Sequence, residues 1–201
     1  MTTWVPLIVN TGSNQIQELP SGQDLNLTGS NISNVVAITI NSSGGTSIVN
    51  GGANTTGNIG SSSTYFNTVF ATATTALYAD LAENYLADTD YAPGTVVCFD
   101  GSAEVTQCNT DACPVVAGVV STNPAYQMNS GLVGEHIATV ALVGRVPCQV
   151  QGPIKRGAMM VSAGNGRARA ESNPAMGTVI GKALETFDGE IGTIEIVVGR
   201  L

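Results

Sequence analysis

The chain has 201 residues, of which 43% are hydrophobic and only 11% are charged. Its formal net charge is −8, and no lysine or arginine occurs before Arg145. Nucleic-acid binding depends on Lys and Arg that neutralise phosphates, so this acidic N-terminal part argues against it. Ordinary domains carry about a quarter charged residues. Low charge with abundant Gly, Ser, Thr and Asn therefore indicates surfaces covered by turns or by other subunits.

Residues 1–24 form the first predicted segment, a strand-rich anchor. Residues 3–9 are a strand-like apolar run, and a turn follows at 10–14. Trp4 is the only tryptophan. It is either the anchor residue of a subunit contact, where Trp is enriched, or a local core residue. We expect Trp4, Leu7 and Val9 to carry the anchoring contact.

Residues 25–70 are predicted to form a slender β-rich shaft. Ile38 and Ile40 alternate with polar residues, which is the period of a strand, and glycine pairs supply tight turns. Strands this short and this poor in aromatic residues cannot build a core alone. Three identical chains around one axis could, because each would supply a third of the interior. A disordered linker over 25–58 is the alternative.

Residues 71–87 are the best helix candidate, because Ala and Leu are strong helix formers. Leu77, Leu81 and Tyr85 recur at i, i+4 and i+8, with Tyr78 beside them. A helix of about four turns is marginal alone in water. We therefore expect three copies to pack into a short helical neck that holds a homotrimer. Packing of the helix onto the following domain is the alternative.

Residues 88–201 are predicted to be all β. Their candidate strands are rich in β-branched residues and are separated by Gly, Pro and Asn turns. The candidates are 95–99, 115–121, 137–143, 146–150, 159–162, 178–183 and 193–198. This spacing is typical of a compact barrel or sandwich. The predicted fold class is thus mainly β, with an anchor, a shaft, a helical neck and a C-terminal β-domain, in a trimer.

A motif runs through residues 59–101. A Gly-Ser-Ser segment with Phe and Val precedes Ala-Leu-Tyr-Ala-Asp-Leu-Ala-Glu, and Pro-Gly-Thr-Val-Val follows. The residues that carry it are 60–62, Phe66, Val69, 71–72, 76–83, Tyr85, 93–97, Phe99 and Gly101. The motif resembles bacteriophage tail-fibre and head-fibre proteins, and a weaker likeness continues to residue 185.

That resemblance implies a structural virion protein, a short homotrimeric fibre of a tail or a head. Its N-terminus would join baseplate, tail or capsid proteins, and its C-terminal domain would face outward for host attachment, in contact with a host surface receptor. A capsid or baseplate decoration protein is the first alternative. A self-cleaving fibre chaperone is the second, and it would need a nucleophile positioned by an acid. Asn84, Ser121 and Asn123 are the candidates for that nucleophile.

No other pattern predicts an enzyme, a cofactor or a metal. His136 is the single histidine, and no nucleophile-elbow or nucleotide-binding motif is present. A glycosidase needs paired carboxylates in a cleft with aromatic residues. Neither Asp88 with Asp90 nor the acidic group around Asp188 has that setting. No run of about 18 apolar residues and no basic signal region occurs. We therefore expect assembly in a cytoplasm and no membrane insertion. The resemblance to phage fibres implies that this is the cytoplasm of the bacterial host and that the protein is part of the virion.

The four cysteines leave three interpretations open. Cys98 and Cys148 lie in predicted strands, where cysteine is commonly a small buried hydrophobe. Cys108 and Cys113 are the most plausible disulfide, although a disulfide is disfavoured in a cytoplasm. Their spacing of four intervening residues is not the usual zinc spacing. Buried thiols are the preferred reading, before one disulfide and then a metal site.

Overall fold

The computed structural model describes residues 7–10, 15–18, 37, 59, 61, 63–64, 66–69 and 75–199. The chain divides into two compact units, Met1–Val69 and Phe70–Leu201. All regular secondary structure in the described residues is strand, which confirms the prediction of a mainly β fold. None of these residues belongs to a helix long and apolar enough to cross a membrane.

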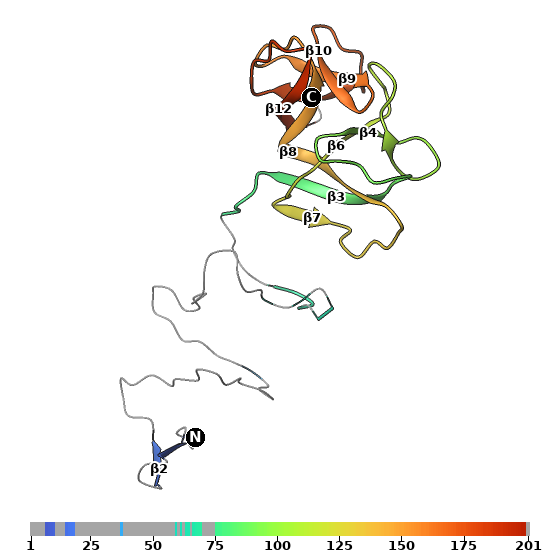
Figure 1. Ribbon diagram of the computed structural model, residues 1–201. Coiled ribbons are helices and arrows are strands. Elements are labelled where there is room, and N and C mark those ends of the chain that lie inside the picture. The colour runs from blue at the N-terminus through green and yellow to red at the C-terminus, as the bar shows by residue number, and fades with distance from the viewer. Residues whose placement is uncertain are drawn as a thin grey trace. The chain divides into compact units, whose positions relative to one another are not determined.

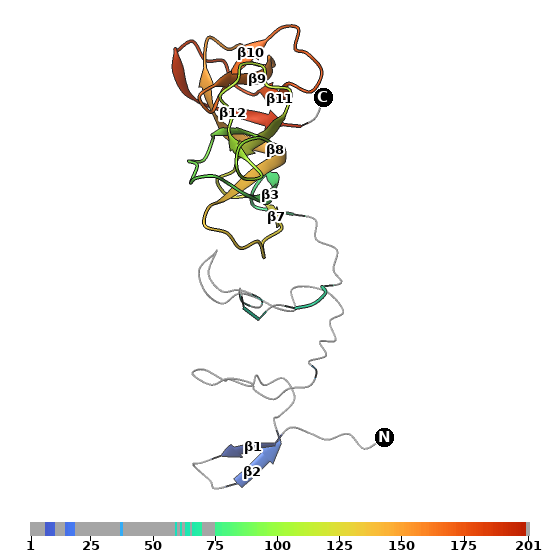
Figure 2. The same ribbon diagram turned by 90° about the vertical axis from the view of Figure 1, so that its right-hand side faces the viewer.

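The first unit contains one described hairpin. Strand β1 (Leu7–Asn10) pairs antiparallel with β2 (Gln15–Glu18), and Asn10 lies opposite Gln15 (Figure 2). The predicted anchoring residues Leu7 and Val9 lie on β1. Trp4 and the predicted shaft over 25–58, apart from Ala37, fall outside the described residues.

The second unit is built from ten strands in one sheet (Figure 1). The strands are β3 (Asp80–Leu86), β4 (Val96–Cys98), β5 (Thr106–Gln107), β6 (Val116–Val120), β7 (Tyr126–Met128), β8 (Ile137–Gln151), β9 (Met159–Gly164), β10 (Arg167–Glu171), β11 (Val179–Ala183) and β12 (Ile191–Val198).

Five of these strands close into a barrel. The second half of β8 pairs antiparallel with β12, and the sheet continues through β11 and β9 to β10. Strand β10 then returns to β8 through the parallel pair Ala168 and Val150. Closure removes the free strand edges that would otherwise invite aggregation. The C-terminal domain is therefore a barrel, one of the two architectures expected from the strand spacing.

The barrel interior follows the period of two along its strands. In β8, Val146, Cys148 and Val150 are buried, and the residues between them are only partly so. Met160 of β9 and Ile196 of β12 are fully buried in the same cluster. Each such side chain contributes about 1.5 to 3 kcal/mol by its burial, so this cluster is the main source of the domain's stability.

The first half of β8 leaves the barrel and organises the rest of the unit. It pairs with β3 along one edge and with β6 along the other, and β4 and β5 extend the sheet from β6. A second buried cluster, which includes Val97, Val105, Val120 and Val140, lies against this part. In Figure 1 β3 and β7 lie side by side at one end of the unit, and β9 and β10 lie at the other.

Most strands of the C-terminal domain were predicted at their observed places, with one merger and four omissions. The candidates 137–143 and 146–150 are one continuous strand, β8. The missed strands are β3, β5, β7 and β10. Two of them, β5 and β7, span only two and three residues, too few for a period of two to be recognised.

The prediction of a helix over 71–87 is wrong for residues 80–86, which form β3. Ala and Leu favour a helix locally, yet every residue of β3 pairs with a residue of β8. Asp80, Ala82 and Asn84 are buried, whereas the residues between them are not, which is the burial pattern of a strand. Tertiary pairing with a buried strand outweighs a propensity difference of a few tenths of a kcal/mol per residue.

Candidate functional site

The four residues predicted to hold a trimeric neck lie at the start of the second unit. Leu77 and Tyr78 precede β3 and are 75% and 48% exposed. Leu81 lies on β3 and is 36% exposed. Tyr85 differs from the other three, because its hydroxyl donates to Glu83 Oε2 at 2.8 Å and its ring packs edge-on against Phe99 at 5.6 Å. Tyr85 is thus held within its own chain, while the other three present apolar surface to the outside.

Strand pairing extends this apolar surface from one strand to three. Leu81 pairs with Tyr126 of β7 on one side and with Val143 of β8 on the other. Residues paired across a sheet point to the same face, so the three side chains form one row. Tyr126 is 65% exposed and Val143 is 58% exposed. We call Leu81, Tyr126 and Val143 the apolar row.

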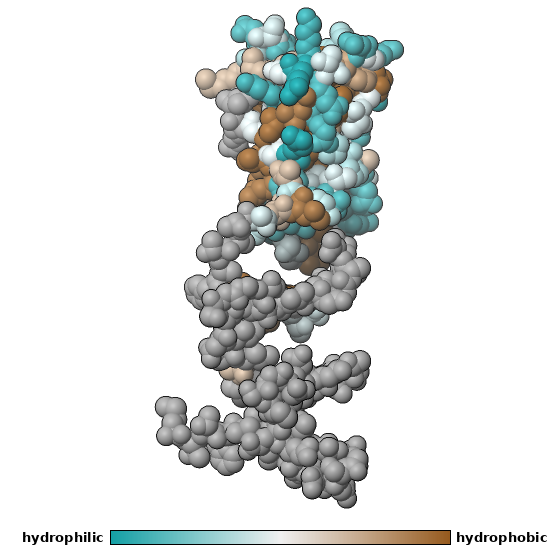
Figure 3. All heavy atoms as spheres, turned by 90° about the vertical axis from the view of Figure 1, so that its left-hand side faces the viewer, coloured by the Kyte–Doolittle hydropathy of each residue, from teal (hydrophilic) through white to brown (hydrophobic). Residues whose placement is uncertain are grey.

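The apolar row lies where the chain enters the domain. Arg145 N donates to Ala79 O at 3.2 Å, and Ala125 N donates to Asp80 O at 2.8 Å, so residues 79–80 are held between the strands that carry Val143 and Tyr126. Figure 3 shows hydrophobic residues reaching the surface on one face of this unit, with hydrophilic residues gathered at one of its ends. The row and the exposed residues just before it therefore give this entry point an apolar character.

A buried polar pair lies beneath the start of β3. The Ser121 hydroxyl donates to Asp80 Oδ2 at 2.6 Å, and the two residues are only 7% and 5% exposed. Ser121 N also donates to Thr139 O at 2.8 Å, which fixes the loop after β6 against β8. The structure thus places the predicted nucleophile candidate Ser121 next to Asp80, an acid that no sequence motif indicates.

Asn84 is satisfied by a network on the same face of β3. Its Oδ1 accepts from Thr139 Oγ1 and from Gln127 Nε2, both at 2.8 Å, and its carbonyl accepts from Asn129 Nδ2 at 3.0 Å. A side chain with these contacts ties β3 to β7 and β8. Asn123 lies in the loop between β6 and β7 and is not brought to Asn84 or Ser121 by any described hydrogen bond. Asn84 thus has a structural role in holding β3.

His136 is paired with a different acid from the one beside Ser121. Its Nδ1 lies 2.8 Å from Asp90 Oδ1, and this hydrogen bond raises the pKa of the imidazole. Since the chain has one histidine, no Ser-His-Asp arrangement forms around Ser121.

Asp88 accepts hydrogen bonds from the hydroxyls of Tyr91 and Thr106, and the bond from Tyr91 lowers the pKa of the Asp88 carboxyl.

Among the described residues, an arginine of β10 forms an ion-pair network with two carboxylates. Arg169 donates to both carboxylate oxygens of Asp111, at 2.6 and 2.8 Å, and to Glu171 Oε2 at 2.9 Å. The bonds from Arg169 lower the pKa of both carboxyls. Asp111 lies in the loop that follows β5, so the arginine fixes that loop to the barrel.

All four cysteines are buried free thiols, as the preferred sequence reading expected of Cys98 and Cys148. The Cys108–Cys113 disulfide is not formed in this structure. Cys98, Cys108 and Cys113 nevertheless lie together, with sulfur atoms within 4.8 Å of one another. Cys148 is buried in the same core cluster but does not belong to this group.

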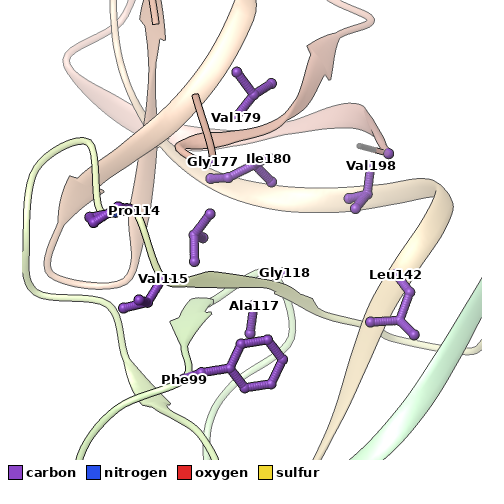
Figure 4. Close-up of a pocket in the computed structure, with 12 residues that line it drawn as sticks. Phe99, Pro114, Val115, Ala117, Gly118, Leu142, Gly177, Val179, Ile180 and Val198 are labelled. Atoms are coloured by element: carbon purple, nitrogen blue, oxygen red, sulfur yellow. The ribbon is translucent and has the colours of Figure 1, made fainter. Parts of the chain in front are cut away.

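A second apolar surface is a groove of about 470 Å³ between β6 and β11. Figure 4 shows Ile180 and Val198 on one side of it and Phe99, Val115 and Ala117 on the other. No charged side chain lines it. The lining side chains are apolar, and the polar atoms exposed in the groove belong to the main chain.

Comparison with family models, with curated proteins and with solved structures finds no match for this chain. The sequence predicted Leu77, Tyr78 and Leu81 as neck residues, and it held no signal for Tyr126 and Val143, which the structure places beside Leu81. Tyr126 lies in a strand of only three residues, which is too short to be recognised from its sequence. Val143 lies in a strand whose apolar residues are partly buried and partly exposed, so its exposure could not be predicted from the sequence around it. Only the pairing of β3 with β7 and β8 brings them together.

Proposed function

We propose that this chain is a structural protein of a bacteriophage virion that forms a short homotrimeric fibre of a tail or head. In this proposal, residues 1–24 anchor the fibre on other virion proteins, and the barrel domain faces outward for host attachment. The observation that carries the trimer is the apolar row at the entry to the barrel domain, together with the exposed Leu77 and Tyr78 before it. The place in a phage virion rests on the resemblance of residues 59–101 to phage fibre proteins.

The row favours contact with further copies of the same chain. Its three members lie on neighbouring strands of a rigid sheet, so they form a continuous surface instead of scattered exposed residues, which are ordinary on any protein. Because these side chains are 36% to 65% exposed, covering each would contribute about a third to two thirds of the roughly 1.5 to 3 kcal/mol of full burial. Identical copies around an axis would bring the same entry points together, and the low charge of the chain, 11%, is typical of surfaces covered in an assembly.

Light scattering of the purified full-length protein tests the oligomeric state. The expected mass is three times the 20.5 kDa of the chain. Val143→Asp should lower this mass, because the assembled state would bury an unpaired carboxylate at a cost of several kcal/mol. A wild-type monomer at all accessible concentrations would contradict the proposal.

Ile191→Asp is the matched control for Val143→Asp. Both residues are β-branched, lie on strands and are 58% exposed. Ile191 pairs with Gln151, the last residue of β8, which lies eight residues beyond Val143. The control should keep the trimeric mass. If both variants dissociate, or neither does, the row is not the contact surface.

Truncation separates the anchoring and attachment roles. Removal of residues 1–24 should leave a folded trimer that no longer joins the particle. Removal of the barrel domain should leave particles that assemble but do not adsorb to the host. Normal adsorption by those particles would favour the alternative of a decoration protein. Nothing in this proposal requires a cofactor, nucleic acid or catalysis.

The Asp80–Ser121 pair favours one second candidate, self-cleavage of a fibre chaperone. Ser121 would be the nucleophile and Asp80 the group that accepts its proton. The pair is buried and has no histidine beside it, so a purely structural role for it fits the fibre proposal. Incubation of the purified protein followed by mass spectrometry distinguishes the two. A shorter species in the wild type that is absent from Ser121→Ala would establish cleavage, whereas an intact chain in both would exclude it.

A further inference from the structure

Three of the four thiols converge on one point beside the barrel core. The sulfur atoms of Cys98, Cys108 and Cys113 lie within 4.8 Å of one another, and the three residues are 5%, 0% and 4% exposed. Ligands bound to one metal ion at about 2.3 Å lie about 3.8 to 4.0 Å apart in tetrahedral or trigonal geometry. The sulfur–sulfur distances of up to 4.8 Å are close to that spacing, so a small movement of the three side chains toward one another would place all three sulfurs on one ion.

Three separate segments supply these thiols. Cys98 ends β4, and its main chain pairs with Thr106 of β5. Cys108 follows β5, where its N–H donates to Val96 O at 3.0 Å. Cys113 follows a turn in which Ala112 has a φ of 47°, a left-handed conformation that is uncommon for a residue other than glycine.

The loop that returns Cys113 to the other thiols is fixed by contacts beyond the sulfurs. Ser162 Oγ accepts from Cys113 N at 2.8 Å and donates to Thr110 O at 2.9 Å. Arg169 holds Asp111 through two hydrogen bonds. Such supporting contacts orient ligands before an ion binds and reduce the ordering that binding requires.

The cluster does not suit a nucleophile or a disulfide. All three thiols are buried, so none of them is accessible to attack a substrate from solvent. A disulfide would join only two of the three sulfurs and leave the third without a role. A soft metal ion uses all three, and it deprotonates the thiols that bind it.

We propose that Cys98, Cys108 and Cys113 form a three-thiolate site for a soft metal ion, Cu(I), that staples β4, the end of β5 and the following loop to one another. Thiolate ligands select Cu(I), Zn²⁺ and iron–sulfur clusters. No fourth His, Cys, Asp or Glu of the described residues joins the group, and the Ser162 hydroxyl already has two partners. Structural zinc almost always takes four ligands, so three favour Cu(I). Binding forms three metal–sulfur bonds and releases three protons, with no change of oxidation state.

The test is an anaerobic titration of the reduced, full-length protein with Cu(I) in competition with the chelator bicinchoninate. One Cu(I) per chain should be withheld from the chelator. Cys98→Ala, Cys108→Ala and Cys113→Ala should each weaken binding by more than about 100-fold, because loss of a ligand costs more than loss of a residue that only supports a ligand, which costs about 10- to 100-fold. Cys148→Ala is the matched control, because Cys148 is equally buried but outside the group.

Thermal unfolding gives a second readout that does not depend on the chelator. Cu(I) should raise the Tm of the wild type and of Cys148→Ala, since a ligand that binds only the folded state stabilises it. It should not raise the Tm of Cys113→Ala, whose fold is checked by circular dichroism. Absence of Cu(I) binding, equal loss in all four variants, or a disulfide found by mass spectrometry in protein prepared without reductant would overturn the proposal.

Discussion

Gly144→Ala should destabilise the barrel domain by about 2 to 4 kcal/mol. Gly144 has a φ of 117°, where a side chain brings strain of about 1 to 3 kcal/mol. A Cβ there would lie 2.2 Å from Ala79 O and 2.6 Å from Asp80 Cα, which are main-chain atoms that cannot rotate away. The start of β3 must therefore shift, and the 3.2 Å hydrogen bond from Arg145 N to Ala79 O is lost, at about 1 kcal/mol for each bond.

Urea unfolding measures this change as a lower midpoint at unchanged m-value. Gly157→Ala separates strain from collision, because Gly157 has a φ of 85° but no atom within 4 Å of the added Cβ. It should cost only about 1 to 2 kcal/mol, the usual cost of a left-handed residue. Hydrogen exchange should show lost protection of β3 in Gly144→Ala alone. Equal destabilisation by the two substitutions would refute the close approach of β3 to β8.

Three further predictions concern the core and the charged groups. Met160→Ala, at a fully buried position of β9, should lower the free energy of unfolding by about 2 to 5 kcal/mol in urea. Asp90→Asn should lower the pKa of His136 in an NMR titration, because the hydrogen bond to Asp90 raises that pKa. In the wild type, this bond stabilises the fold fully below the unfolded histidine pKa of about 6.5, and the stabilisation is lost as pH rises through the folded pKa of His136. Arg169→Met should make the free energy of unfolding less dependent on pH in the acid range. In the wild type, the lowered pKa of Asp111 contributes stability above the unfolded pKa of about 3.9, and this stability is lost as pH falls through the folded pKa of Asp111.

The sequence by itself determined the β character of the C-terminal domain. The β-branched runs at 95–99, 115–121 and 178–183 become β4, β6 and β11, because alternation and turn residues act locally. It also predicted that Cys98 and Cys148 are buried within strands. Cys148, for example, shares the period of two with the apolar Val146 and Val150, which predicts one buried face of the strand.

Only the tertiary structure decided which strands meet. Residues 80–86 have a helical propensity, and their strand conformation depends on β8, more than 50 residues away. The same pairing gathers Leu81, Tyr126 and Val143 into the apolar row, and the fold of the loop after β5 brings Cys113 to Cys98 and Cys108. Barrel closure depends on a single pair, Ala168 with Val150. The local pattern of apolar residues determines which side chains of a strand share a face. Which strands pair depends on the apolar surface buried in the whole domain, and no single segment of the sequence contains that information.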